Sequence, residues 1–228
     1  MKEVENTLKV IQTADGSRSL LHSELNTAYH SVHGALQESR HIFIQHGLLF
    51  AADRFRQKLN VLEIGFGTGL NALLSLEFAN RHQTKINYRG IEKFPVPAPV
   101  QNELDYASTF EPAIRSEIQG VLEAPWNATV HISDYFELYK SNEDARWLTP
   151  LQNLHLIYFD AFAPAHSPEL WQESLFSTLY QSMAPGGILV TFCAKGSVKR
   201  LLKSCGFGVE ALPGPPGKRE MTRAIKPF

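Results

Sequence analysis

Three carboxylates in the sequence stand at the ends of apolar runs that are typical of β-strands. They are Glu92, Asp134 and Asp160. Because open parallel sheets bind ligands outside the carboxyl ends of their strands, we expect these side chains to line one site. Each of them, taken singly, is about as well explained as a helix N-cap. Together they predict a row of acceptors suited to hydroxyl, amino or cationic groups.

A glycine-rich loop lies upstream of these acids, in the stretch NVLEIGFGTGLN that begins at Asn60. Gly65, Gly67 and Gly69 separate an apolar strand from a helix, and glycines there let the backbone approach a ligand closely. The dinucleotide fingerprint G-x-G-x-x-G would require a glycine where the chain has Leu70. A phosphate-binding P-loop would require a lysine that the loop lacks. The alternative without a ligand is a tight turn whose glycines serve packing alone.

The charges beside the loop favour S-adenosylmethionine over a polyphosphate. Glu63 would repel phosphates, but it tolerates a ligand that carries an ammonium and a sulfonium group. Glu92 follows at the spacing at which a carboxylate accepts hydrogen bonds from ribose hydroxyls, and Asp134 is placed to accept from an adenine amino group. The predicted cofactor-binding residues are Glu63, Gly65, Gly67, Gly69, Asn71, Glu92, Asp134 and Asp160.

Strands and helices alternate from Asn60 onward, which is typical of a parallel sheet with helices on both faces. The predicted strands span 60–65, 86–92, 128–133, 154–160 and 186–194, and the predicted helices span 69–81, the 96–118 region, 135–140, 167–183 and 197–205. Beyond Gly206, two strand-like runs joined by a short turn predict an antiparallel hairpin. An α/β sheet with this ending is typical of the class I, Rossmann-like methyltransferase fold.

The N-terminal part of the chain has a different pattern. Residues 8–23 predict a hairpin with Asp15 and Gly16 at its turn, and a helix is expected from about Gly34. We therefore expect a small β/α extension over residues 1–52 and a class I methyltransferase domain over residues 53–228.

The composition describes an ordinary globular protein, with 228 residues, of which 43% are hydrophobic and 20% are charged. The first residues include acids where a signal peptide has a basic start, and no apolar run is long enough to cross a bilayer. With Cys193 and Cys205 as the two cysteines, a disulfide framework is not expected. We therefore expect a cytoplasmic protein that does not enter a membrane.

The charge of the chain is unevenly distributed. From Lys195 to the end, eight basic residues stand against two acidic ones, a balance of +6. Since the net charge is −1, the preceding 194 residues carry −7. Such a basic end is suited to a polyanion, although a run of charges is more often a solvated surface.

Nine histidines raise the question of a metal site, above all the pair His30 and His33 with His41 and His46 nearby. The chain lacks an H-E-x-x-H motif and a cysteine pair with ligand spacing. We therefore expect no metal site.

Five stretches, which span nearly the whole chain, resemble the methyltransferase part of the MnmC family of bacterial tRNA 5-methylaminomethyl-2-thiouridine biosynthesis proteins. The glycine loop is shared with other methyltransferases, whereas the last three stretches are specific to that family. They are YHSVHGALQESRHIFI (29–44), VLEIGFGTGLNALL (61–74), FDAFAPAHSPELW (159–171), GGILVTFCAKGSVKRLL (186–202) and LPGPPGKREMTRA (212–224).

The resemblance implies methyl transfer from S-adenosylmethionine to the amine of 5-aminomethyl-(2-thio)uridine at the wobble position of tRNA. It also implies a stand-alone form, since we find no second glycine-rich loop for the FAD-dependent oxidase of bifunctional members. Other enzymes would then install the aminomethyl group.

The resemblance further implies a substrate site made of segments from both ends of the chain. The N-terminal members would close over the methionine end of the cofactor or over the substrate. The C-terminal members would contact tRNA phosphates or orient the acceptor. The residues concerned are Tyr29, His30, Glu38, Lys195, Lys218 and Arg219.

Asp160 is the candidate catalytic residue. An alkylammonium has an unperturbed pKa near 10.4, so it must lose a proton before its lone pair can attack. Because an unperturbed aspartate has a pKa of about 3.9, we expect Asp160 to orient the amine and balance charge more than to remove its proton. Phe162, two residues further on, is expected either to stack on the base or to be a core residue.

Three other functions remain open at this stage. A class I transferase that acts on a small amine is disfavoured by the basic C-terminal part. An NAD-dependent oxidoreductase is disfavoured by the glycine spacing and the terminal hairpin. A cofactor-binding protein without catalysis is only mildly disfavoured by an intact Asp160.

Overall fold

The computed structural model describes residues 7–228, and within that range the chain forms two sheets. The smaller sheet is antiparallel and consists of β1 (Leu8–Gln12), β2 (Arg18–His22) and β3 (Thr27–Ala28). Its first two strands form the predicted hairpin. The Asp15 carboxylate accepts hydrogen bonds from the Ser17 backbone N–H and the Thr13 hydroxyl, which closes the turn.

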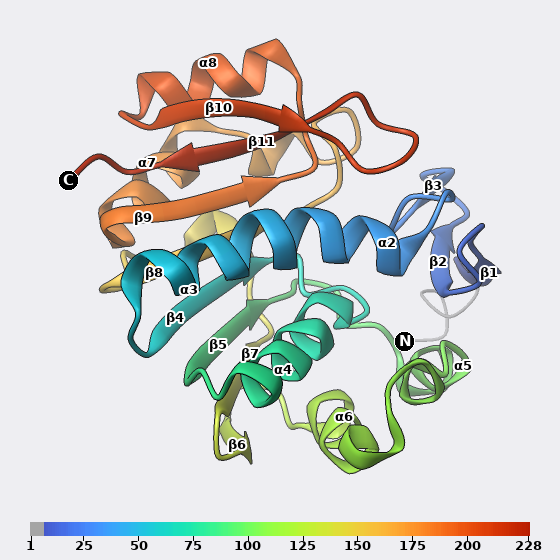
Figure 1. Ribbon diagram of the computed structural model, residues 1–228. Coiled ribbons are helices and arrows are strands. Elements are labelled where there is room, and N and C mark those ends of the chain that lie inside the picture. Colours follow the sequence, from blue (N-terminus) through green and yellow to red (C-terminus); the bar gives the residue numbers. More distant parts are fainter. Residues whose placement is uncertain (1–6) are drawn as a thin grey trace.

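The larger sheet carries the parallel strands expected from the sequence. Its members are β4 (Leu59–Ile64), β5 (Ile86–Ile91), β6 (Thr129–Ser133), β7 (Phe136–Ser141), β8 (Leu154–Phe159), β9 (Met183–Thr191), β10 (Gly208–Pro213) and β11 (Glu220–Ile225). Their order among the described residues is β10-β11-β9-β8-β4-β5-β7-β6 (Figure 1). The five strands from β9 to β7 are parallel, and β6, β11 and β10 pair antiparallel at the two sides. The predicted terminal hairpin is confirmed.

Helices cover both faces of this sheet. The α-helices are α2 (Ala35–Ser39), α3 (Phe50–Phe55), α4 (Leu70–His82), α5 (Ala98–Glu103), α6 (Arg115–Glu123), α7 (Glu173–Ser182) and α8 (Gly196–Ser204). The π-helix η1 (Arg40–Leu49) joins α2 to α3, so that residues 35–55 form one long helix across the sheet (Figure 1). Short 3₁₀ helices span Tyr106–Thr109, Pro112–Ile114, Ala145–Trp147 and Pro168–Leu170.

The central strands are apolar throughout because they are buried on both faces. In β8, Leu156 and Tyr158 belong to the core beneath η1 and α4, whereas Ile157 and Phe159 face the core beneath α7 and α8. This alternation fixes the register of the strands, and the register determines which residues reach their carboxyl ends.

One predicted element is wrong. Residues 135–140 were expected to be helical, but the structure has strand β7 there, paired parallel with β5 and antiparallel with β6. Phe136, Leu138 and Lys140 are buried at every second position, which is the spacing of a strand. The chain therefore adds a β6–β7 hairpin at the edge of the sheet.

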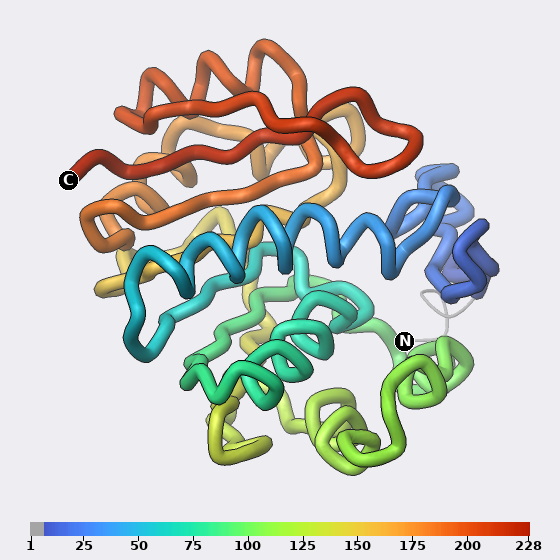
Figure 2. Tube along the Cα trace, viewed as in Figure 1, coloured from blue at the N-terminus to red at the C-terminus, as the bar shows by residue number. Residues whose placement is uncertain are grey.

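An N-terminal segment and the turn between β10 and β11, far apart in the sequence, lie close together at one side of the sheet. The turn between β10 and β11 lies beside the N-terminal sheet and α2 (Figure 2). The His41 ring nitrogen Nε2 lies 2.9 Å from the Pro213 carbonyl oxygen, and Lys218 forms an ion pair with Glu38. Residues far apart in the sequence thus enclose one space.

Candidate active site

A cavity of about 1170 Å³, here called the main cavity, opens at the carboxyl ends of β4, β5, β7 and β8. The loops after these strands form its floor, and the N-terminal sheet and the β10–β11 turn form its cover. This volume exceeds the range of roughly 300–1,000 Å³ that is usual for a single small ligand. It leaves room for a nucleoside-sized ligand together with a second reactant.

The glycine loop between β4 and α4 lines the main cavity with backbone. Gly65, Gly67 and Gly69 have φ angles of +88°, +50° and +78°, which disfavour residues with a Cβ. A Cβ at Gly65 would also lie 2.7 Å from the Asp160 carbonyl oxygen. One at Gly67 would lie 3.3 Å from the Tyr29 ring. The glycines are therefore needed both for the course of the loop and for its close contacts.

Glu92 lies beside this loop. Its carboxylate accepts hydrogen bonds of 2.9 Å from the backbone N–H groups of Gly67 and Phe94, one at each oxygen. Burial raises the pKa of Glu92 above its usual value. Since a carboxylate oxygen accepts more than one hydrogen bond, both oxygens retain capacity for hydroxyl donors in the main cavity. Binding of ribose hydroxyls by Glu92 remains a prediction.

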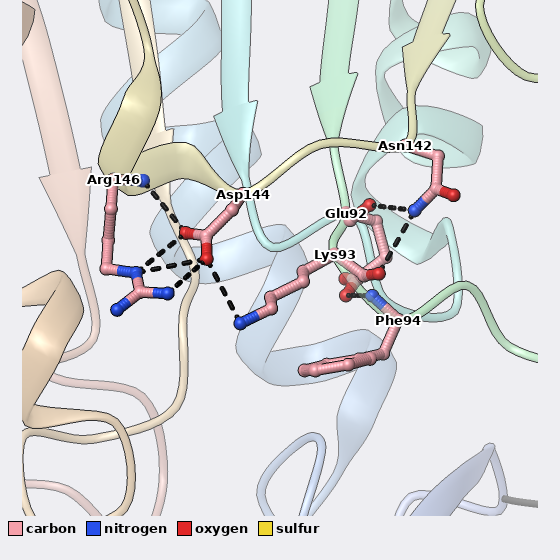
Figure 3. A network of polar contacts seen from close by, with 6 residues as sticks. All are labelled: Glu92, Lys93, Phe94, Asn142, Asp144 and Arg146. Atoms are coloured by element: carbon pink, nitrogen blue, oxygen red, sulfur yellow. Dashed lines mark hydrogen bonds and ion pairs between the residues drawn. The ribbon is translucent and has the colours of Figure 1, made fainter.

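A polar network fixes the loops that follow β5 and β7 (Figure 3). The Asn142 amide donates to the carbonyl oxygens of Glu92 and Lys93, both at 3.0 Å. Asp144 pairs with Lys93 at 3.0 Å and with the Arg146 guanidinium at 2.6 Å. The hydrogen bonds from Arg146 hold the pKa of Asp144 well below its usual range. Sequence reasoning missed this network because it treated the preceding strand as a helix.

Asp134 does not belong to this site. It lies in the turn between β6 and β7, and the neighbouring Tyr135 carbonyl accepts a hydrogen bond from Ile86, the first residue of β5. It is exposed at the edge where the parallel strands begin, which is opposite the main cavity. The sequence-based placement is wrong because β6 is antiparallel, so its carboxyl end points the other way. The side chains after β7, Glu143 and Asp144, line the main cavity instead.

Asn71, in the first turn of α4, joins two acids. Its side-chain amide donates hydrogen bonds of 2.8 Å to Glu63 and to Asp160. Glu63 also accepts a hydrogen bond of 2.8 Å from the Tyr88 hydroxyl. It is buried beneath the loop and does not line the main cavity. The predicted direct contact between Glu63 and a cofactor is therefore wrong. Asn71 and Asp160 do line it.

Burial changes the acidity of this cluster. It raises the pKa of Glu63 to about 8. Burial, followed by the charge of Glu63, raises the pKa of Asp160 well above its usual value. The side-chain oxygen of Asn71 is buried and has no hydrogen-bond partner among residues 7–228. A ligand with an N–H or O–H donor would satisfy that oxygen.

Aromatic residues from two segments form one wall of the main cavity. The rings of Tyr29 and Phe162 meet edge to face, with centroids 5.1 Å apart. The Trp171 indole donates a hydrogen bond of 2.8 Å to the Phe162 carbonyl oxygen and anchors the loop. Phe162 is therefore part of the cavity wall and is not a core residue.

Polar residues complete the cover. His30 Nδ1 lies 2.8 Å from the Ser19 hydroxyl, and burial lowers the pKa of His30 to about 4, so the ring is neutral near pH 7. Glu38 accepts a hydrogen bond of 2.6 Å from the Ser31 backbone N–H and pairs with Lys218. The Lys218 ammonium also lies 4.4 Å from the centre of the Phe192 ring.

Two predicted substrate residues lie elsewhere. Lys195 and Arg219 are exposed and are not part of the cavity wall. They can meet only the parts of a substrate that extend beyond the main cavity. Phe94, by contrast, was not expected from the sequence; it is 65% exposed and lines the mouth of the main cavity.

The main cavity suits a cationic nucleoside better than a polyphosphate. Glu92 and Asp160 supply carboxylate oxygens, and Asn71 supplies a buried acceptor without a partner in the described chain. The two lysines of its wall, Lys93 and Lys218, are each paired with an acid. These residues fit S-adenosylmethionine, with Glu92 placed for hydroxyl groups and Asn71 for a donor group.

Residues 7–228 contain no cluster of three histidine, cysteine, aspartate or glutamate side chains arranged to hold a metal ion. Within the same residues, no helix is long and apolar enough to span a membrane.

Comparison with known proteins defines the class. Residues 109–227 match the family described as S-adenosyl-L-methionine-dependent methyltransferase. This match covers more than half of the chain, so the chain belongs to that family, and S-adenosylmethionine is its methyl donor. The predicted fold class and cofactor are confirmed.

Similar proteins of known name point to a narrower group within this methyltransferase family. A protein of Ectopseudomonas mendocina named tRNA 5-methylaminomethyl-2-thiouridine biosynthesis bifunctional protein MnmC is 31% identical over 216 residues, which cover 85% of this chain and 31% of that one. Its namesake in Chromohalobacter salexigens is 31% identical over 215 residues, with coverage of 87% and 30%. The resemblance predicted from the sequence is confirmed. The chain spans about a third of the length of these relatives.

Solved structures share the fold. The crystal structure of MNMC2 from Aquifex aeolicus superposes with a TM-score of 0.73 at 23% identity, covering 97% of this chain and 72% of that one. A probable spermidine synthase from Corynebacterium glutamicum gives a TM-score of 0.54 at 17% identity, covering 96% and 76%. At these identities the likeness concerns the fold alone.

Proposed function

We propose that this methyltransferase acts on the amine of 5-aminomethyl-(2-thio)uridine at the wobble position of tRNA, giving 5-methylaminomethyl-(2-thio)uridine. The observation that carries the proposal is the setting of Asp160. Its Oδ2 accepts from Asn71, and its Oδ1 has no partner within residues 7–228, so it remains available to an amine in the main cavity. The relatives that match most of the chain are named for this tRNA modification.

The residues of the main cavity have different roles in the proposed reaction. When bound, S-adenosylmethionine supplies an electrophilic methyl carbon, and the amine must present its lone pair to it. Asp160 orients the amine through Oδ1 and balances the positive charge of the reacting groups. The rings of Tyr29 and Phe162 offer a flat wall against which a uracil ring can pack. Closure by the cover excludes water, which strengthens these electrostatic contacts.

The N-terminal part has its own role in this proposal. We assign residues 1–52 to an extension and residues 53–228 to the methyltransferase domain, with the extension contributing its described residues up to Glu38 to the cover of the main cavity. Leu8, Tyr29 and Glu38 support this assignment because all three line the main cavity. The boundary falls inside α3, so the extension is continuous with the domain through the long helix.

A tRNA substrate agrees with the exposed cations near the main cavity. Lys195 follows β9, and Arg219 lies next to Lys218 in the β10–β11 turn. Both can contact phosphates of a substrate whose modified base has entered the main cavity. The proposed reaction takes place in the cytoplasm, after other enzymes have installed the aminomethyl group.

The test is transfer of a labelled methyl group from S-adenosylmethionine to bulk tRNA that carries the unmethylated aminomethyl group. Labelled 5-methylaminomethyl-(2-thio)uridine is expected after digestion to nucleosides. The shared fold with a spermidine synthase favours small amines as the second candidate substrate. Label on a polyamine, with none on tRNA, would replace the tRNA proposal by this alternative.

A further inference from the structure

A row of three residues crosses the N-terminal sheet. His22 of β2 stands opposite Leu8 of β1 and opposite Thr27 of β3. Because directly paired residues of an antiparallel sheet extend to the same face, the three side chains lie next to one another across the strands. All three line the main cavity. The cover therefore presents one apolar and two polar side chains, side by side, to a ligand in the main cavity.

The tautomer of His22 follows from a backbone contact. Its Nδ1 accepts a hydrogen bond of 3.3 Å from the backbone N–H of Leu25, in the turn between β2 and β3. An imidazole nitrogen that accepts a hydrogen bond carries no proton, so the proton of the ring is at Nε2. Within residues 7–228, Nε2 has no hydrogen-bond partner. His22 thus has one N–H donor that the described chain leaves available.

The position of the His22 ring shows where this donor can act. The ring meets that of Phe162 nearly at a right angle, with centroids 6.5 Å apart. Phe162 in turn meets Tyr29 at 5.1 Å, and these two rings form the aromatic wall of the main cavity. The His22 donor therefore lies next to the wall that the proposed function assigns to the uracil ring.

A uracil base has an acceptor that matches this donor. Its C4 carbonyl oxygen is next to C5, the carbon that bears the aminomethyl group. Cytosine has an amino group in this place, which donates and does not accept. The Thr27 hydroxyl, also without a hydrogen-bond partner in the described part of the chain, can accept from N3–H of uracil or donate to N3 of cytosine. Of the two polar side chains in the row, His22 is therefore the one that distinguishes the pyrimidines.

We propose that His22 is a specificity-determining residue, whose Nε2–H donates a hydrogen bond to the C4 carbonyl oxygen of the substrate uracil. The inference rests on the proposed function, which supplies the uracil. The same contact excludes cytosine, because the amino group of cytosine would face the His22 N–H and leave both donors without an acceptor. A site built around such a hydrogen bond rejects an analogue that cannot form it.

Two substitutions separate this role from a purely local one, in which His22 only closes the turn through Nδ1. In His22→Asn the side-chain oxygen takes the place of Nδ1 and can accept from the Leu25 N–H, but no donor reaches as far as Nε2 did. In His22→Gln the longer side chain brings an N–H donor to about the place of Nε2, while the acceptor for the turn is lost. The two variants therefore give opposite results for the two roles.

The experiment measures methyl transfer to two synthetic anticodon hairpins, one with 5-aminomethyluridine and one with 5-aminomethylcytidine at the wobble position. Wild type should prefer the uridine hairpin, and the preference is the ratio of the two kcat/KM values. In His22→Asn this ratio should fall about tenfold, which corresponds to the loss of one hydrogen bond and of the penalty for two facing donors. In His22→Gln it should stay within about threefold of the wild-type ratio, because a donor is retained.

His82→Asn is the matched control. His82 is the last residue of α4, stacks on Phe78 and lies outside the wall of the main cavity. Its substitution should leave both kcat/KM values as in wild type. In all three variants the affinity for S-adenosylmethionine, measured by calorimetry, should stay within about twofold, since Asn71 and Glu92 are untouched.

Three results overturn the inference while the proposed function stands. One is a wild type that methylates both hairpins equally well. Another is a uridine preference that survives in His22→Asn and disappears in His22→Gln, which would leave His22 as a turn residue. The third is a loss of S-adenosylmethionine affinity in His22→Asn as large as its loss in kcat/KM. Failure of the proposed function differs from all three, because wild type then methylates neither hairpin, and the inference falls with it.

Discussion

A single carboxylate, Asp160, combines the two demands of the proposed reaction, since it lines the main cavity and is fixed from below by Asn71. We expect Asp160→Asn to lower kcat for tRNA methylation by roughly 10²–10³, which is the usual cost of losing one preorganised electrostatic contact. Binding of tRNA should persist in gel-shift assays. Asp134→Asn is the control because Asp134 lies at the opposite edge of the sheet, and its kcat should equal that of wild type. An Asp160→Asn enzyme at full rate would reduce this residue to a structural cap.

Gly67 is constrained both by its backbone conformation and by its position in the wall of the main cavity. Valine there would meet a φ of +50° and crowd the Tyr29 ring at 3.3 Å, besides entering the space next to the main cavity. We expect Gly67→Val to weaken S-adenosylmethionine binding at least about tenfold in calorimetry. Gly16→Val is the matched control, because Gly16 has a φ of +85° but nothing within 4 Å of a Cβ. Equal affinities in the two variants would show that the loop is not a ligand contact.

Glu63 also makes stability depend on pH. Its pKa rises from 4.5 in the unfolded chain to about 8 in the folded one, so the folded state binds the extra proton between these values. Stability from this group is therefore present below about pH 4.5 and is lost as pH rises through about 8. We expect urea unfolding midpoints of wild type to fall over that range more than those of Glu63→Gln. Parallel pH curves for the two proteins would contradict the raised pKa.

The sequence predicts most residues of the site, but it does not predict the direction in which their side chains point. The sequence identifies Glu63, Asn71 and Asp160 as polar groups next to a glycine loop. Because β4 is buried on both faces, its apolar neighbours do not reveal which way Glu63 points. The Asn71 bridge depends on the packing of α4 against β8, and no spacing in the sequence encodes that contact.

At the scale of elements, the wrong prediction of a helix at residues 135–140 also led to the wrong placement of Asp134. FELYKS is too short to distinguish a strand from a helical turn by periodicity with certainty. Treating it as helical made β6 the third parallel strand and moved Asp134 to the wrong edge. The polar stretch after β7, with Asn142 and Asp144, was overlooked for the same reason. The π-helix η1 was also unforeseen; its Gly47 packs closely against Val190 and Tyr158, which is a tertiary effect.

The Glu38–Lys218 pair links α2 to the β10–β11 turn across the cover of the main cavity. Lys218→Met leaves the buried Glu38 carboxylate with the Ser31 N–H but without its cation. We expect a loss of about 1–3 kcal/mol in unfolding free energy, the cost of an unsatisfied buried acceptor. The double variant with Glu38→Gln should recover part of that loss in a denaturant double-mutant cycle. Strict additivity of the two substitutions would show that the pair does not couple the segments.

At the scale of the whole molecule, fewer basic side chains of the C-terminal part are available to a partner than its composition suggests. Lys199 pairs with Glu220, Arg223 with Glu210, and Lys218 with Glu38. Lys226 donates to two backbone carbonyls. Four of the eight basic residues after residue 194 are thus engaged in contacts within the fold. The basic residues of this part that are exposed are Lys195, Arg200, Lys203 and Arg219.

The salt dependence of tRNA binding tests whether these exposed cations hold the substrate. Arg200 and Lys203 lie on α8, which begins just beyond β9 at the cavity side of the sheet. If each neutralises one phosphate, Arg200→Gln with Lys203→Gln should reduce the slope of log affinity against log salt by roughly 1.4 to 1.8. KM for tRNA should rise while kcat at saturation stays unchanged, because neither residue lines the main cavity. The control is Arg56→Gln with Lys58→Gln, two exposed cations before β4 at the opposite edge. Equal slopes for the two double variants would mean that α8 is a solvated face and that tRNA is bound elsewhere.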